Sequence, residues 1–150
     1  MTNFSKKDTE SLTKLIAKQL GLFERYLDEI SEQAEFIRFD DDEGLTASIE
    51  AQGKVIEEID KLHKKTAPLI AAYKESEKSK DDSCPIGKAL ARIKAILKEA
   101  SDLNEQNIKA AEEKKAEYSE LISKLDKDKK GISGYAQQIT ETSDLFDKKQ

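Results

Sequence analysis

Residues 86–125 read IGKALARIKAILKEASDLNEQNIKAAEEKKAEYSELISKL, and the side chains that recur there at alternating steps of four and three decide the fold. These side chains are Ile86, Leu90, Ile93, Leu97, Ala100, Asn104, Asn107, Ala111, Tyr118, Leu121 and Leu125. Spacing of this kind keeps side chains on one face of a helix. The stretch therefore predicts one long helix with a continuous contact face.

The middle of this contact face is polar. Its first half is aliphatic, but Asn104, Asn107 and Lys114 follow. Amide and ammonium groups gain nothing from burial unless something forms hydrogen bonds with them. We therefore expect a partner to pack against this part of the helix.

Two amphipathic helices precede this one. Apolar residues recur at the same steps over residues 8–38 and 42–77. Pro68 predicts a kink in the second helix, because proline removes a backbone hydrogen bond and clashes with the preceding turn. Between the helices, Asp40 followed by Glu43 predicts a capping box. We favour this over a calcium loop, since the residue order of such loops is absent.

The predicted fold is all-α. The long helix should cover residues 85–128, and Gly131 is typical of a glycine C-cap after it. Residues 131–150 carry too few apolar side chains to fold alone, so we expect a flexible tail. The sequence thus predicts one domain over residues 1–130, built as a coiled-coil-like rod of three long antiparallel helices that run up, down and up.

The composition narrows the classes of function. Charged residues make up 38% of the 150 residues and the net charge is −5 with the signs interspersed, which does not fit nucleic-acid binding. Cys84 is the only cysteine, so an internal disulfide framework is excluded. The chain has no apolar run typical of a secretory signal or a membrane span. We expect a cytoplasmic protein.

The sequence offers few groups for catalysis. Asp60 and His63 have the spacing of one ligand pair of a di-iron bundle, but that site needs a second pair and the chain has a single histidine. Cys84 has no thiol or histidine beside it in the sequence, which favours an inert thiol over a nucleophile. We therefore expect no enzyme activity, no metal and no cofactor. The remaining class of function is recognition of another protein by helical surfaces.

Two short elements stand out near the C-terminal end. One is Leu103-Asn104-Glu105-Gln106-Asn107, and the other is Tyr135-Ala136-Gln137-Gln138-Ile139. They resemble the Leu-Asn-x-x-Asn element and the tyrosine motif that follows it in the FlgN-type export chaperones of bacterial flagella, which are small proteins made of long antiparallel helices. The rest of the chain is similar in its pattern of helices.

This resemblance implies that the partners are hook-filament junction proteins, whose terminal helix the chaperone would cover and deliver to the export apparatus. Asn104 and Asn107 would fix the register of the client helix, or would bond to the chain's own helices. Tyr135 could contact the export gate, or could be a tail tyrosine without such a role. The apolar positions that a client helix would bury are Ile108, Ala111, Tyr118, Leu121, Ile122, Leu125 and Ile139.

A second hypothesis belongs to a different class of protein. The same contact faces could be saturated by identical copies, which would make the chain a coiled-coil spacer or a self-associating bundle subunit. A homodimer without any client also stays open. The two hypotheses differ on the tail, because a spacer has no reason to keep apolar residues there.

Overall fold

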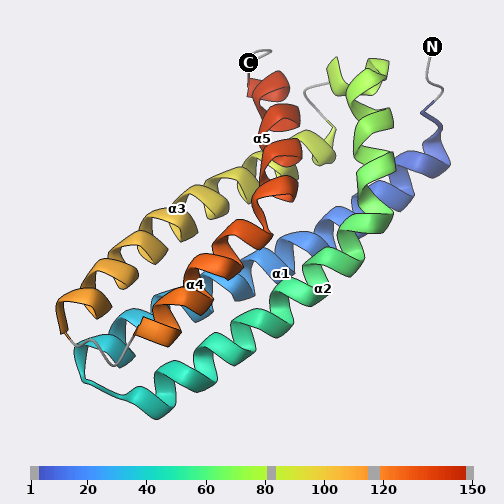
Figure 1. Ribbon diagram of the computed structural model, residues 1–150. Helices are drawn as coiled ribbons and strands as arrows, with labels where there is room; N and C mark the ends of the chain where they lie inside the picture. The colour runs from blue at the N-terminus through green and yellow to red at the C-terminus, as the bar shows by residue number, and fades with distance from the viewer. Residues whose placement is uncertain (1–3, 81–83, 115–118, 148–150) are drawn as a thin grey trace.

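The computed structural model describes residues 4–80, 84–114 and 119–147, and the described residues are nearly all helical, with no strand among them (Figure 1). The expected all-α fold is therefore confirmed. The helices are α1 (Lys6–Arg38), α2 (Asp42–Glu75), a short 3-10 helix η1 (Glu77–Lys80), α3 (Pro85–Lys114), α4 (Ser119–Gly131) and α5 (Ser133–Asp147).

The start of α1 is fixed by a capping box. The backbone N–H of Asp8 donates to Ser5 Oγ at 3.0 Å, and the backbone N–H of Ser5 donates to Asp8 Oδ2 at 3.1 Å. Each side chain thus satisfies an amide that has no partner inside the helix. Along α1 the residues that face the interior recur at the predicted steps of three and four, and they are Leu12, Ile16, Gln19, Phe23, Tyr26, Ile30, Gln33 and Ile37.

The turn between α1 and α2 differs from the predicted capping box. Asp41, rather than Asp40, caps α2, and its Oδ1 accepts the Gly44 amide at 2.9 Å. Asp40 instead has a φ of 53°, in the left-handed region. The tight reversal needs one left-handed residue, which aspartate tolerates better than most residues, so the capping role falls to the next aspartate.

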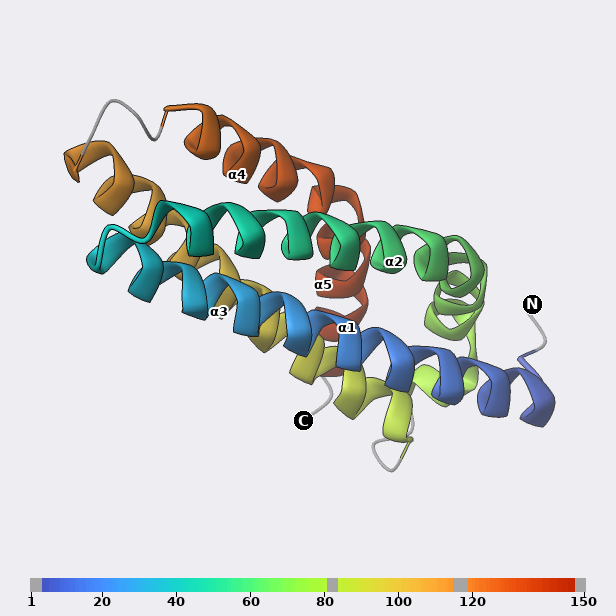
Figure 2. The same ribbon diagram turned by 90° about the horizontal axis from the view of Figure 1, so that it is seen from below.

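The three long helices pack together, with α1 lying along both α2 and α3. Asn107 of α3 contacts Ile30 of α1, and Lys114 contacts Arg38, so the contacts advance together along both helices. Figure 1 accordingly shows the C-terminal ends of α1 and α3 at the same end of the molecule. Seen from below, α1 and α2 form the near face and α5 lies behind them (Figure 2).

The third helix is shorter than predicted. It ends at Lys114 instead of near residue 128, and the chain returns as α4, which packs against α2 and α3. Lys114 already lies beside Arg38, the last residue of α1. A straight continuation would carry Leu121 and Leu125 beyond the α1–α2 turn, where nothing could cover them. The return of α4 buries Leu125 completely.

The segment expected as a flexible tail is helical over most of its length. It forms α5, which lies mainly against α3 and also contacts α2 and α4. Ile132 and Ile139 join the main hydrophobic core, and Thr142 and Ser143 are buried as well. Ile132, Tyr135 and Ile139 have the spacing of residues on one face of a helix, so the sequence does contain the pattern of an amphipathic helix here. The segment is too polar to fold alone, and it is helical where it packs on the rest of the chain.

Pro68 leaves α2 unbroken. The helix continues through it to Glu75, and Figure 1 shows its last part bending upward alongside α5. Because α2 bends near Pro68, its last part runs beside α5, which contacts α2 at Ala67 and Lys74. Beyond α2 lies η1, whose Ser79 Oγ donates to the backbone carbonyl oxygen of Ser76 at 2.8 Å.

Candidate protein-binding surfaces

The structure does not bring the residues expected to bind a client together on one exposed face. Tyr118 lies outside the described residues. The buried members are Asn104, Asn107, Ala111, Leu125 and Ile139. The half-buried members are Ile108, Leu121, Ile122 and Tyr135.

The apolar residues and the tyrosine of α5 among them belong to two apolar clusters inside the molecule. The smaller cluster lies at the end where α1 meets α2, and in it Ile37, Leu45 and Ile49 pack with Ile108, Ala111, Leu121, Ile122 and Leu125. Ile139 and Tyr135 belong to the larger core, with residues of α1, α2 and α3. The chain itself therefore covers the surface that the sequence assigned to a client.

The two asparagines of α3 lie in the interior but are not equivalent. Asn107 Nδ2 donates to the backbone carbonyl oxygen of Ile30 at 2.9 Å, which ties α3 to α1. Asn104 is fully buried, and neither atom of its amide has a hydrogen-bond partner among the described residues. Of the two alternatives for the asparagines, Asn107 therefore forms its hydrogen bond with another helix of the chain itself. For Asn104, burial of the amide costs folding free energy that no such hydrogen bond offsets.

A chain of buried amides links α1, α2 and α4. Gln33 Nε2 donates to Gln52 Oε1 at 2.7 Å, and Gln52 Nε2 donates to Asp128 Oδ2 at 3.1 Å. Burial raises the pKa of Asp128 above its ordinary value, against the opposing effects of Gln52 and of Lys127 and Lys124. α4 is thus attached partly by a polar contact that places a carboxylate in a poorly hydrated position.

Tyr135 is held by the two residues that resembled half of a metal site. Its hydroxyl donates to Asp60 Oδ1 at 2.8 Å, and its ring lies against the ring of His63 with the centroids 4.7 Å apart. Burial lowers the pKa of His63, while Asp60 acts in the opposite direction. In the described part of the chain no three potential metal ligands come together. The Asp60 and His63 pair therefore positions α5.

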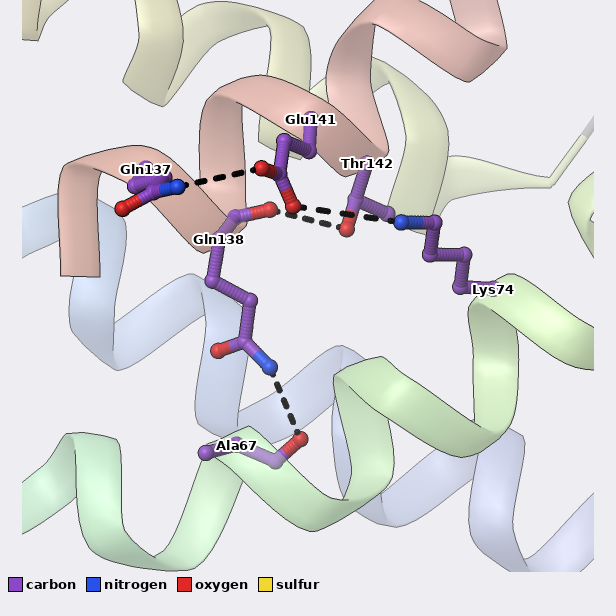
Figure 3. Close-up of polar contacts among 6 residues, drawn as sticks. All are labelled: Ala67, Lys74, Gln137, Gln138, Glu141 and Thr142. Carbon is purple, nitrogen blue, oxygen red and sulfur yellow. Dashed lines mark hydrogen bonds and ion pairs between the residues drawn. The ribbon is translucent and has the colours of Figure 1, made fainter. Parts of the chain in front are cut away.

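Further along α5, polar contacts continue to α2. Gln138 Nε2 donates to the backbone carbonyl oxygen of Ala67 at 3.3 Å, and Glu141 lies 4.0 Å from Lys74 Nζ (Figure 3). The latter is an exposed ion pair of small energetic value. Together with Tyr135, these contacts follow the bent part of α2 and fix the position of α5 along it.

A groove open to solvent runs along the α1–α2 pair. Its larger part, which we call the basic section, has a volume of about 560 Å³. Leu22 and Leu62 are half-buried in its lining, and Arg25 pairs with Glu58 across it at 3.6 Å. The residues that line the basic section are Lys18, Gly21, Leu22, Arg25, Glu58, Lys61, Leu62 and Lys65.

A second hollow lies between the same two helices, nearer to their turn. This acidic section has a volume of about 260 Å³ and is lined by Glu29, Glu32, Phe36, Gly44, Ala47, Ser48 and Ala51. Sequence reasoning did not identify either section. The sequence feature that points to them is the row of apolar residues beside the main contact face of α1, such as Leu22. This row makes the apolar face of α1 wider than packing against one neighbouring helix requires.

A scan against protein-family models, a search of curated proteins and a search of solved structures found no match to this chain. The likeness to FlgN-type chaperones rests on the residues of α3 and α5 quoted above. In the described part of the chain, no helix combines the length and the apolar character that crossing a membrane requires.

Proposed function

We propose that the chain is a cytoplasmic chaperone of flagellar export. It binds the terminal helix of a hook-filament junction protein, keeps that helix from associating with other copies, and delivers the client to the export apparatus. The observation that carries this proposal is the groove along α1 and α2, which has apolar residues in its lining and is open to solvent. No cofactor and no catalytic step is part of the proposal.

The shape of this groove favours a helix as its occupant. The furrow between two packed helices accepts the ridge of a third helix, and amphipathic helices bind in this way through apolar residues on one face. The two sections extend along α1 from Lys18 to Phe36. This distance corresponds to about 27 Å at 1.5 Å per residue, or five turns of a client helix.

The proposed client site differs from the residues first expected. Asn104, Asn107 and Leu125 are covered by the chain's own helices, so the client would lie on the opposite side of α1 and α2. The proposal includes a rod in which the three long helices run up, down and up, with α4 and α5 closing its other side. A contact of Tyr135 with the export gate would require its hydrogen bond to Asp60 to open.

Native mass spectrometry of the chain, alone and mixed with junction proteins, tests this proposal. We expect a one-to-one complex with one junction protein, which is lost when the terminal helix of that protein is removed. A stable homo-oligomer that ignores every junction protein would overturn the proposal. That result would favour the structural spacer.

A further inference from the structure

We propose that the groove along α1 and α2 selects a partner helix whose charges are separated along its length, with acidic residues in one half and basic residues in the other. The inference rests on the proposed function in one respect, namely that the occupant is a helix of another protein. It adds the charge pattern of that helix and the end of the groove at which each half lies.

The two sections lie on one face of the helix pair. In α1 the lining residues Lys18, Leu22, Arg25, Glu29, Glu32 and Phe36 follow one another at steps of four and three. These steps keep them in one row along the helix. The sections are therefore successive parts of one furrow between α1 and α2. Figure 2 shows these two helices lying side by side.

The charges of the two sections have opposite signs. Four cations and one carboxylate line the basic section, which gives it an excess of three positive charges. The charged residues in the lining of the acidic section are Glu29 and Glu32. This separation stands out in a chain of net charge −5, whose charges are otherwise interspersed. A partner helix with the complementary order of charges matches both sections at once.

The lining between these charges is apolar and partly unfilled. A Cβ atom built on Gly21 would meet no atom within 4 Å, so the basic section is open above this residue. Leu22 and Leu62 are half-buried there, and Phe36 is half-buried in the acidic section. Leucine-type residues of a partner could bury this surface at intervals of three and four. The apolar contact supplies affinity, and the charges set the register and direction.

The probes are two labelled peptides of about 18 residues, the length that spans both sections. Both contain the same leucines on one helix face and equal numbers of Glu and Lys. In the segregated peptide Glu occupies one half and Lys the other, whereas in the alternating peptide the two are mixed. We expect the segregated peptide to bind the intact chain about tenfold more tightly in fluorescence anisotropy at low salt. Equal affinities would overturn the proposal.

Charge reversal in the groove locates the site. The double variant Lys61→Glu with Lys65→Glu should lose this preference for the segregated peptide. The control is Lys88→Glu with Lys98→Glu, which makes the same change in net charge on exposed positions of α3. The control should bind as the unmodified chain does. An equal loss in both variants would mean non-specific attraction and would overturn the proposal.

Filling the groove gives a test that does not depend on charge. Gly21→Gln places a side chain over the basic section and should weaken binding of the segregated peptide. Gly53→Gln is the matched variant, because a Cβ at Gly53 also meets no atom within 4 Å and Gly53 does not line either section. The two variants should have similar helix content by circular dichroism. Unchanged binding by the Gly21 variant would count against the groove as the site.

The same variants distinguish this inference from the proposed function. A junction protein that binds the Lys61→Glu, Lys65→Glu variant as tightly as the unmodified chain would overturn the groove inference and leave the chaperone function standing. Selective binding of the segregated peptide by a chain that binds no junction protein would do the reverse.

Discussion

The hydroxyl of Tyr135 on α5 lies 2.8 Å from Asp60 Oδ1 on α2, and this hydrogen bond joins two residues that are 75 positions apart in the sequence. The carboxylate is an ionised acceptor, which makes the bond stronger than one between neutral groups. His63, three residues after Asp60, packs against the same ring. The segment first expected as a tail is thus held at its start by a specific side-chain contact.

Tyr135→Phe should lower the free energy of unfolding by about 1 kcal/mol, because it removes one net hydrogen bond and leaves the ring in place. Urea denaturation followed by circular dichroism measures the change. Asp60→Ala and the double variant complete a double-mutant cycle, in which the coupling energy between the two positions should be of the same size. Strict additivity of the two single changes would show that the hydrogen bond contributes nothing to stability.

The same contact predicts a dependence on alkaline pH. Burial, with a further contribution from Asp60, raises the pKa of Tyr135 to about 12 from its ordinary value of 10.0. Between these two values the folded chain keeps a proton that the unfolded chain has lost, so stability should fall as the pH rises from 10 toward 12. Tyr135→Phe should flatten this fall without abolishing it, because burial and Asp128 also raise the pKa of Tyr26. An identical slope in the variant would contradict the prediction; urea midpoints at pH 9 and pH 11 provide the comparison.

Much of the helical framework could be predicted from the sequence, because its signals are local. The steps of three and four along α1 and α2 identify the buried faces, and Pro85 begins α3 as expected. The break after Lys114 could not be read in this way. The spacing continues through Leu121 and Leu125, and periodicity reports which side chains share a face but not whether a neighbour is long enough to cover them.

The site was harder to predict for the same reason. Asn104 and Asn107 are polar residues on an apolar face, and the sequence does not say whether their partner is another protein or another helix of the chain. In the structure, Asn107 donates a hydrogen bond to the carbonyl oxygen of Ile30, which is 77 residues away in the sequence. The open groove depends on residues beside the main contact face, such as Leu22 and Leu62, whose environment is set by the distance between α1 and α2.

Asn104 and Asn107 should respond in opposite ways to the same substitution. Asn104→Leu replaces a buried amide without a partner by a side chain of similar size, and should raise the free energy of unfolding by about 1 kcal/mol. Asn107→Leu removes the hydrogen bond to Ile30 and should lower it by about the same amount. Chemical denaturation of the two variants side by side gives the answer. Equal destabilisation by both would mean that Asn104 has a partner in solution.

Leu121 and Leu125 should also differ, although both lie on α4. Leu125 is 0% exposed, so Leu125→Ala leaves a cavity and should cost about 2–5 kcal/mol of stability. Leu121 is half-buried, and Leu121→Ala should cost clearly less because part of its surface already contacts water. Thermal and urea unfolding measure both costs. Near-unchanged stability of the Leu125 variant would show that α4 does not pack on α2 and α3 in solution.

Asp128→Asn should make the folded chain more stable at pH 7. Burial raises the pKa of Asp128 above its ordinary value of 3.8, so the ionised carboxylate disfavours the folded state at neutral pH. The asparagine oxygen can still accept the hydrogen bond that Gln52 donates at 3.1 Å.

As the pH falls toward 4, the folded chain takes up a proton at Asp128 before the unfolded chain does. The stability advantage of Asp128→Asn should therefore shrink. Urea unfolding at both pH values measures this, with Asp126→Asn as the control at the carboxylate that pairs with Lys130 on the same helix. Lower stability of the Asp128 variant at pH 7 would mean that Lys124 and Lys127 stabilise the charge more than burial penalises it.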